Sequence, residues 1–504
     1  MKRDWLWLGI GSFILYSSLL TQQYVGDGLR WVATITGPWP PILGGTNHLL
    51  FPVLGWLWYH VIGVWLPETM QLQSIQLLNA TAGAVGIAIF TLIVARLGSS
   101  RSATWLASIC LIFTAAYWVN ATEMLEVMPS IPLILFGIWL VLPKEDDDEP
   151  LRLWRILLAG TALGLATAIY QASAFSVAAL CAAVWWHPSR VVPTLQRLRG
   201  IFLALFSFSI MAAALYLVSF RFIGGAAGLS EALRQSLATE SPVAFGRVDP
   251  RHLAGSLFGW VAVWLGLFNF QGLNYLLRFG LTLSVIVNLF LVALQYGLCG
   301  IVAWAAWNTK GFRFGREWRS LKIIAAWFVP PFLFTAFWLP SYSKIWISPL
   351  AATIAALAIL LTASKSAPAS WPVLARVAAV GLCGLTVAIN LVTGLLPSHF
   401  ATNVYLNEVM ELSESIATND LVITDWGASA TYYHTFSHKP ALSYAAVALG
   451  HTFDDSAVSK ILAQRIAETQ CGGGTAYFLG ILDWTPEDWQ PLFGDRFGLS
   501  YAEL

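Results

Sequence analysis

The residues of this sequence best suited to chemistry are the few charged side chains that stand where long apolar segments end. Asp27 lies in residues 24–30 (YVGDGLR), between two glycines that let another group approach the backbone closely. Glu123 and Glu126 belong to the short turn of residues 120–126 (NATEMLE). A cavity or plain solvation at a turn explains such carboxylates equally well, so all three are candidates for proton transfer or binding.

A lone cation stands between two later apolar segments. This is Lys344, in residues 340–346 (PSYSKIW), with Tyr342 two residues before it. A snorkelling lysine at a membrane interface and a phosphate-binding lysine both fit this position. Arg221 and Arg278 are comparable cations at the ends of apolar segments.

Asn47 and His48 open an apolar, tryptophan-rich stretch in residues 44–52 (GGTNHLLFP). A histidine in a loop is most often a satisfied polar residue, and the alternative is a role in a nearby site. Carboxylates and cations at the ends of apolar segments fit the transfer of a group from a lipid phosphate. In that chemistry a carboxylate removes a proton from an acceptor hydroxyl, and a cation stabilises the phosphate that leaves.

The composition indicates a membrane protein. Of the 504 residues, 57% are hydrophobic and 11% are charged, and the mean hydropathy is +0.66, whereas soluble proteins carry about 25% charged residues. Four of the five cysteines lie in apolar runs and Cys471 stands alone, so no disulfide framework or CxxC metal site is predicted. The net charge of +1 and the lack of a basic domain argue against nucleic acid as a partner.

The apolar runs predict an all-α polytopic membrane protein with about eleven transmembrane helices. The expected spans lie near residues 4–22, 72–96, 102–120, 127–143, 155–170, 171–187, 201–222, 279–306, 322–340, 345–363 and 374–395. The fifth and sixth are short for the hydrocarbon thickness, so they are expected to be half-helices of one excursion. The aromatic run 254–270 is expected to lie flat at the interface.

Basic residues are divided unevenly between the two sides of this topology. Seventeen of the 28 lysines and arginines fall on one side, in short loops or at span ends, and the positive-inside rule makes that side cytoplasmic. They are Lys2, Arg3, Arg96, Arg101, Lys144, Arg152, Arg155, Arg190, Arg197, Arg199, Lys310, Arg313, Arg316, Arg319, Lys322, Lys365 and Arg376. An odd number of spans then predicts a cytoplasmic N-terminus and an extracytoplasmic C-terminus.

Two domains are expected. Residues 1–397 form the transmembrane domain, with large outer loops at 23–71 and 223–278. Residues 398–504 are more polar and alternate between helix and strand patterns, which predicts a small extracytoplasmic α/β domain. Its expected elements are helices at 404–416 and 456–469 and strands at 421–425 and 475–479.

The order of these features resembles the GT-C superfamily of polyprenyl-phosphate-sugar glycosyltransferases. It is similar to the bacterial family 39 type, related to protein O-mannosyltransferases and aminoarabinose transferases. The likeness covers the whole layout. It rests on the acidic GDG loop after the first span, the NHLLFP element, the broken pair of spans, the YSKIWISPL element and the DLVITD strand, at residues 24–30, 47–52, 160–172, 342–350 and 420–425.

The resemblance implies roles for the candidate residues. Asp27 would be the catalytic base, and Glu123 or Glu126 would help bind the acceptor or a metal ion, with Asn47 and His48 as further candidates for that role. Lys344 would hold the carrier phosphate. Three more candidates for phosphate binding are Tyr342, Arg221 and Arg278.

The first loop departs from the pattern of many relatives in one respect. They pair two adjacent acids there, whereas Gly28 follows Asp27 in this chain. Metal dependence is therefore open, and a divalent ion is the one candidate cofactor.

The expected activity is that of an inverting hexosyl- or pentosyltransferase. A sugar would move from a polyprenyl-phosphate donor to a polysaccharide, lipid or protein hydroxyl on the outer face of a bacterial inner membrane. Three other functions stay open. A polysaccharide polymerase or ligase would use several outer arginines, available as Arg221, Arg234, Arg247, Arg251 and Arg278. A transporter would be expected to show mid-span charges and an internal repeat, and an envelope scaffold would act through its C-terminal domain.

Overall fold

The computed structural model describes residues 3–24, 26–37, 48–67, 70–142, 152–187, 193–222, 230–231, 256, 259–260, 263–266, 283–308, 316–338, 343–364, 371–424, 427–437, 439–444, 447 and 455–479. They form two compact units. The first comprises Met1–Thr21 and Gly37–Phe400, and the second comprises Gln22–Thr36 and Ala401–Leu504. The segment that carries Asp27 is grouped with the C-terminal residues.

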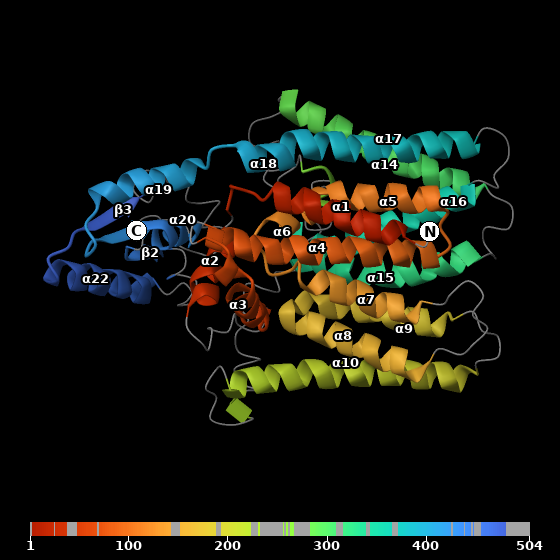
Figure 1. The fold of residues 1–504 in the computed structure, drawn as a ribbon, viewed down its shortest axis with the longest axis horizontal. Helices are drawn as coiled ribbons and strands as arrows, with labels where there is room; N and C mark the ends of the chain where they lie inside the picture. The colour runs from red at the N-terminus through yellow and green to blue at the C-terminus, as the bar shows by residue number, and fades with distance from the viewer. Residues whose placement is uncertain are drawn as a thin grey trace. The chain divides into compact units, whose positions relative to one another are not determined.

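The first unit is a bundle of helices, most of them roughly parallel (Figure 1). A helix lies over each of the expected spans. The long helices are α1 (Asp4–Ser18), α4 (Gln71–Arg96), α5 (Arg101–Phe113), α6 (Ala115–Thr122), α7 (Ser130–Val141), α8 (Leu153–Ile169), α9 (Val177–Trp185), α10 (Thr194–Phe222), α14 (Leu283–Trp307), α15 (Arg316–Trp338), α16 (Ile347–Ala363) and α17 (Trp371–Asn390). Shorter helical pieces are α3 (Phe51–Val61), η2 (Gly63–Trp65), η4 (Gln171–Ser176), η6 (Ser343–Trp346), η8 (Leu391–Leu395) and α18 (Leu396–Phe400).

Several of these helices are long and apolar enough to cross a membrane. Within the described ranges there are five, covering Leu72–Arg96, Thr194–Phe222, Leu289–Trp307, Lys344–Ala363 and Trp371–Phe400. The pair α5 and α6 makes a sixth if the two are one span, bent by 58°. The protein is thus an integral, multi-pass membrane protein.

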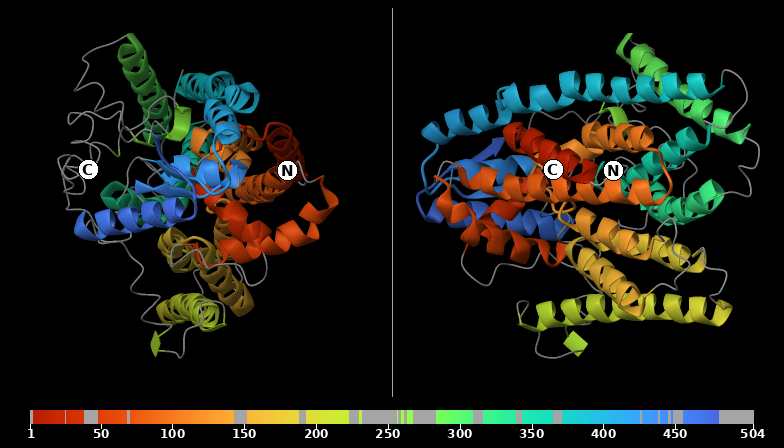
Figure 2. Two further views of the ribbon diagram at one scale, coloured as in Figure 1. Left: turned by 90° about the vertical axis from the view of Figure 1, so that its left-hand side faces the viewer. Right: turned by 45° about the vertical axis from the view of Figure 1, so that its right-hand side comes forward.

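Close packing of α8 against α10 depends on two glycines four residues apart. The two helices lie side by side in both ribbon views (Figures 1 and 2). A Cβ at Gly160 would overlap Ser207 and the Ala204 carbonyl, and one at Gly164 would lie 2.8 Å from the Phe208 carbonyl. Small residues at this spacing let helix backbones approach closely, which favours association through van der Waals contact.

The described residues of the run 254–270 are largely packed inside the protein. Trp260 is 8% exposed and Trp264 is fully buried, and both belong to the main hydrophobic core. Asn390 Nδ2 donates to the carbonyls of Phe113 and Trp264, at 2.7 Å each, and Trp264 Nε1 donates to Thr386 Oγ1 at 2.8 Å. These side-chain bonds satisfy irregular backbone that would be costly among lipids.

The second unit contains a three-stranded parallel sheet in the order β2–β1–β3. Its elements are α2 (Gly26–Thr36), α19 (Val404–Ser415), β1 (Leu421–Thr424), α20 (Gly427–Tyr432), the π-helix η9 (Tyr433–Ser437), β2 (Ala441–Ser443), α22 (Asp455–Cys471) and β3 (Ala476–Leu479). Val422 pairs with Ala441 on one side and with Tyr477 on the other. The two expected strands and two expected helices are present, and β2 is an additional strand of three residues.

Side-chain bonds tie the first-loop segment into this unit. Tyr432 Oη donates to the Tyr24 carbonyl at 2.6 Å, and Asn403 Nδ2 donates to the Gln22 carbonyl at 2.7 Å. Asn403 also caps α19 by accepting from the Leu406 amide at 3.0 Å. One asparagine therefore starts a helix and anchors a segment almost four hundred residues away in the chain.

Candidate active site

The turn between α6 and α7 is held in place by two amides on α4. Asn79 Nδ2 donates to the carbonyls of Glu123 and Leu125, at 2.7 Å and 2.6 Å. Gln76 Nε2 donates to the Thr122 carbonyl at 3.0 Å and also to the Thr21 carbonyl. Both residues are fully buried. They satisfy backbone groups that no helix satisfies, and thereby fix the position of the acidic turn.

Glu126 and Lys344 form a buried ion pair. Lys344 lies on η6, between α15 and α16, and its Nζ donates to Glu126 Oε1. The glutamate side chain is 1% exposed and the lysine side chain 8%. The cost of removing two charges from water often offsets their attraction, so a buried ion pair usually adds little to stability. Such pairs are therefore candidates for a functional role.

His48 completes a trio around the same carboxylate oxygen. Its Nε2 lies 3.2 Å from Glu126 Oε1. The imidazole ring stacks on Tyr170, with ring centres 5.4 Å apart and planes 14° apart. Two residues on, the Leu50 amide donates to the Ala168 carbonyl at 2.9 Å. The end of α8 thus fixes both the ring and the backbone of His48.

The charge state of Glu126 follows from these contacts. Burial by itself raises the pKa of the Glu126 carboxyl, but His48 and Lys344 lower it further than burial raises it. The net result is a pKa well below the usual range, so the carboxylate stays ionised at neutral pH.

A small pocket of about 300 Å³ adjoins Lys344. Helices α7, α15 and α16 line it together with η4, mostly through apolar side chains. Tyr170 and Ser173 also face it. Ser173 Oγ is buried and has no hydrogen-bond partner in the described part of the chain. The pocket therefore offers a cation, an unused hydroxyl and an apolar wall.

The other candidate residues are not part of the trio formed by Glu126, Lys344 and His48. Glu123 is 1% exposed and its carbonyl accepts from Asn79. Arg221 is exposed at the end of α10, beside the ring of Phe222. Asp27 lies on α2 in the second unit, with its side chain outside the described residues. The remaining candidates, all outside the described residues, are Asn47, Tyr342, Arg278, Arg234, Arg247 and Arg251.

The trio is a poor fit for a metal ion. Among the described residues, no group of three or more His, Cys, Asp and Glu side chains lies close enough together to hold one. Glu126 and His48 would supply two ligands, but the carboxylate oxygen concerned already contacts the Lys344 ammonium. An ammonium in contact with this oxygen repels a second cation, so these residues are not suited to hold a metal ion.

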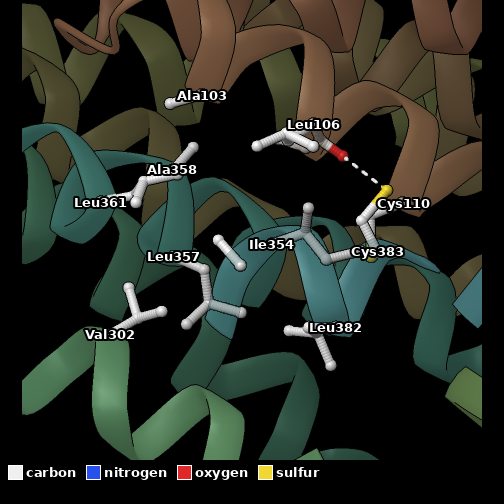
Figure 3. Close-up of a pocket in the computed structure, with 12 residues that line it drawn as sticks. Ala103, Leu106, Cys110, Val302, Ile354, Leu357, Ala358, Leu361, Leu382 and Cys383 are labelled. Carbon is white, nitrogen blue, oxygen red and sulfur yellow. Dashed lines mark hydrogen bonds between the residues drawn. The ribbon is translucent and has the colours of Figure 1, made fainter. Parts of the chain in front are cut away.

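A second pocket, of about 370 Å³, is lined by apolar side chains of α5, α14, α16 and α17 (Figure 3). Cys110 and Cys383 contribute the polar atoms nearest to it, and Cys383 Sγ lies 3.7 Å from the Leu106 carbonyl. Thiols surrounded by apolar groups in this way are chemically inert. This pocket offers no group suited to sugar or phosphate chemistry.

Solved structures of two proteins share the fold. ArnT from Cupriavidus metallidurans, bound to undecaprenyl phosphate, matches with a TM-score of 0.55 at 13% identity, over 88% of this chain and 86% of that one. The oligosaccharyltransferase of Archaeoglobus fulgidus, in complex with zinc and sulfate, matches with a TM-score of 0.54 at 11% identity. That match covers 86% of this chain and 62% of the other. The chain therefore shares its fold with these two proteins. No family model and no curated protein matches the sequence.

Some residues of the site were not predicted from the sequence. Gln76 and Asn79 are polar residues three positions apart in an apolar span. Polar residues within a span often indicate a functional site. Tyr170 marks the expected break between two half-helices. Ser173 carries no local signal, because its role depends on the pocket formed by distant helices.

Proposed function

We propose that this protein is a membrane glycosyltransferase that moves a sugar from a polyprenyl phosphate to a hydroxyl acceptor. The observation that carries the proposal is the buried Lys344 beside an apolar pocket, held by Glu126 and His48 within a GT-C fold. An isoprenoid phosphate combines an anion with an apolar chain, and this site combines a cation with an apolar wall. ArnT, which shares the fold, has been crystallised with undecaprenyl phosphate.

Lys344 is assigned to the carrier phosphate. In the transfer, the bond from the anomeric carbon to the phosphate oxygen breaks as the acceptor oxygen bonds to that carbon. The phosphate gains negative charge as it leaves, and a desolvated ammonium stabilises that charge more strongly than water would. Tyr342, Arg221 and Arg278 remain further candidates for the phosphate, on the basis of the sequence.

A carboxylate must accept the proton of the acceptor hydroxyl. The resemblance assigns this role to Asp27, and Glu126 or Glu123, with Asn47 and His48, to acceptor binding. A single displacement, with attack opposite the phosphate, inverts the anomeric carbon. Hexosyl and pentosyl donors both fit this scheme, and the acceptor is a polysaccharide, lipid or protein hydroxyl.

The proposed setting is the outer face of a bacterial inner membrane. About eleven spans follow from the apolar runs. A cytoplasmic N-terminus and an extracytoplasmic C-terminal α/β domain follow from the distribution of lysine and arginine over these spans. In this arrangement residues 398–504 and the loops 23–71 and 223–278 lie on the side where a lipid-linked sugar would be presented.

The experiment that tests the function is a transfer assay with purified protein in nanodiscs. Radiolabelled polyprenyl-monophosphate sugars are offered as a panel, with envelope glycans, lipids and proteins as acceptors. We expect turnover of at least one donor, and its loss in Asp27→Asn. Turnover of diphosphate-linked oligosaccharides alone would replace the proposal with a polymerase or ligase, and full activity of a folded Asp27→Asn variant would remove Asp27 from the mechanism.

A further inference from the structure

The Lys344 ammonium is already engaged by an anion of the protein itself. Its Nζ donates to Glu126 Oε1, and both side chains are buried. An anionic phosphate that binds the same ammonium would approach within a few ångströms of the carboxylate. Two anions that close repel each other more strongly in surroundings poor in water than in bulk solvent.

A small pocket lies next to the lysine, and the proposal places the phosphate there. The pocket is lined by Lys344 and by Val127, the residue that follows Glu126. A lysine ammonium has three donors on a flexible stem, so it can turn from the carboxylate towards the pocket. Ser173 Oγ, buried and without a partner in the described residues, faces the same space and can donate to a phosphate oxygen.

Glu126 does not lose all its support if Lys344 turns away. His48 Nε2 lies 3.2 Å from the same oxygen, and the His48 ring is held by Tyr170. The carboxylate can therefore stay ionised and in place while it gains free acceptor capacity. A carboxylate in that state is suited to accept a hydrogen bond from an acceptor hydroxyl.

We propose that Lys344 exchanges Glu126 for the donor phosphate, and that this exchange frees Glu126 to bind and orient the acceptor hydroxyl. The inference rests on the proposed function and adds an order to it, since the donor binds first and acceptor binding follows. Glu126 is in this account a positioning residue on the acceptor side and a competitor on the donor side. When no donor is bound, Lys344 occupies the Glu126 carboxylate. Acceptor binding is then disfavoured until the donor has bound.

The exchange makes an unusual prediction for Glu126→Gln. Glutamine keeps the size and a hydrogen-bonding oxygen but removes the competing charge. The variant should bind polyprenyl phosphate about tenfold more tightly than the native protein, within the usual range of coupling between ligands, and should transfer sugar more slowly. His48→Ala should weaken the binding of polyprenyl phosphate. In this variant Glu126 has no contact with His48 when Lys344 turns to the phosphate. A purely structural ion pair predicts weaker binding in both variants.

The experiment measures the affinity of sugar-free polyprenyl phosphate for the full-length protein in nanodiscs, together with donor KM and kcat. Glu408→Gln, at an exposed position on α19, is the matched control and should match the native protein. Tighter binding in Glu126→Gln with weaker binding in His48→Ala supports the exchange. Unchanged or weaker binding in a folded Glu126→Gln variant, while the native protein binds the lipid, overturns the exchange alone. No binding and no transfer in the native protein overturns the proposed function as well.

If Glu126→Gln does not fold, the native protein still tests the order of binding. Initial rates are measured with donor and acceptor both varied, and with polyprenyl phosphate, the product released from the donor, as the inhibitor. Competition with donor at all acceptor concentrations, and weaker retention of acceptor without carrier lipid, are expected. Equal acceptor binding with and without carrier lipid contradicts the proposal.

Discussion

At the residue scale, the site depends on charges that compensate each other out of water. Removing one member of a buried ion pair leaves an uncompensated charge, whereas removing both leaves none. The energetic role of Glu126 and Lys344 can therefore be separated from their chemical role by comparing single with double replacement. Asn79 on α4 also supports the site, because its amide holds the turn that carries Glu126.

The single variant Lys344→Met should lower the free energy of unfolding by up to about 3–5 kcal/mol, because the buried Glu126 loses its ammonium and keeps the contact with His48. The double variant Lys344→Met/Glu126→Gln should be clearly more stable than this single variant. Unfolding in detergent by increasing denaturant measures both. Additive losses in the double variant would show that the two side chains do not interact.

Replacing Asn79 by Leu should destabilise the protein by about 1–3 kcal/mol, since two buried carbonyls lose their donor. The acidic turn would also shift, so sugar transfer should fall more than stability alone explains. Asn308→Ala is the control, because Asn308 donates to one carbonyl at an exposed site. An Asn79 variant as stable and active as this control would refute the role of the amide.

At the scale of elements, the sequence predicts well what is locally encoded. Long apolar runs become helices, and polar alternation after residue 398 becomes α19, β1, α22 and β3. It does not predict features that depend on distant partners. The bend between α5 and α6 has no proline or glycine at Thr114, and its open carbonyl at Phe113 is satisfied by Asn390 on another helix. The packing of Trp264 against α17, through its bonds to Thr386 and Asn390, is another such feature, because these residues are more than 120 positions apart.

The site shows the same division. Isolated charges at the ends of spans identify Glu126 and Lys344 as candidates, but they are 218 residues apart and their contact depends on the packing of α7, α15 and α16. His48 carries almost no local signal. Its importance arises from Tyr170 and from the end of α8, which a single sequence does not place beside it.

The α8–α10 contact should be sensitive to one methyl group. Gly160→Ala should cost about 1–3 kcal/mol of unfolding free energy, because its Cβ overlaps α10. Gly297→Ala on α14 should be neutral or stabilising by up to about 1 kcal/mol, since nothing lies within 4 Å of its Cβ. Equal effects of the two substitutions, measured by unfolding in detergent, would contradict the packing described for α8.

At the scale of the whole molecule, the chain divides into a helical membrane unit and a unit built on a parallel sheet. The first-loop segment Gln22–Thr36 belongs to the sheet unit. The chain thus leaves the first unit after α1, contributes α2 to the second unit, and returns. Changes in Gln22–Thr36 are therefore expected to affect the folding of the C-terminal residues.

The proposed orientation predicts which cysteine reacts from outside. Cys471 is exposed on α22, whereas Cys110 and Cys383 are buried among the spans. A membrane-impermeant maleimide should label the protein in intact cells whose outer barrier is permeable to the reagent, and Cys471→Ser should abolish the labelling. Labelling that requires opening of the inner membrane would place the C-terminal residues in the cytoplasm and reverse the topology.

The most direct test of the central claim is the donor dependence of sugar transfer in the charge-free double variant Lys344→Met/Glu126→Gln, compared with Lys322→Ala at an exposed lysine. The double variant keeps no unpaired charge of the pair, so its folding is preserved while the phosphate-binding cation is gone. We predict that its transfer rate falls by at least about 10²-fold, the scale for loss of one group that stabilises developing charge, with native activity in Lys322→Ala. A folded double variant that turns over donor with native kcat and KM would contradict the account.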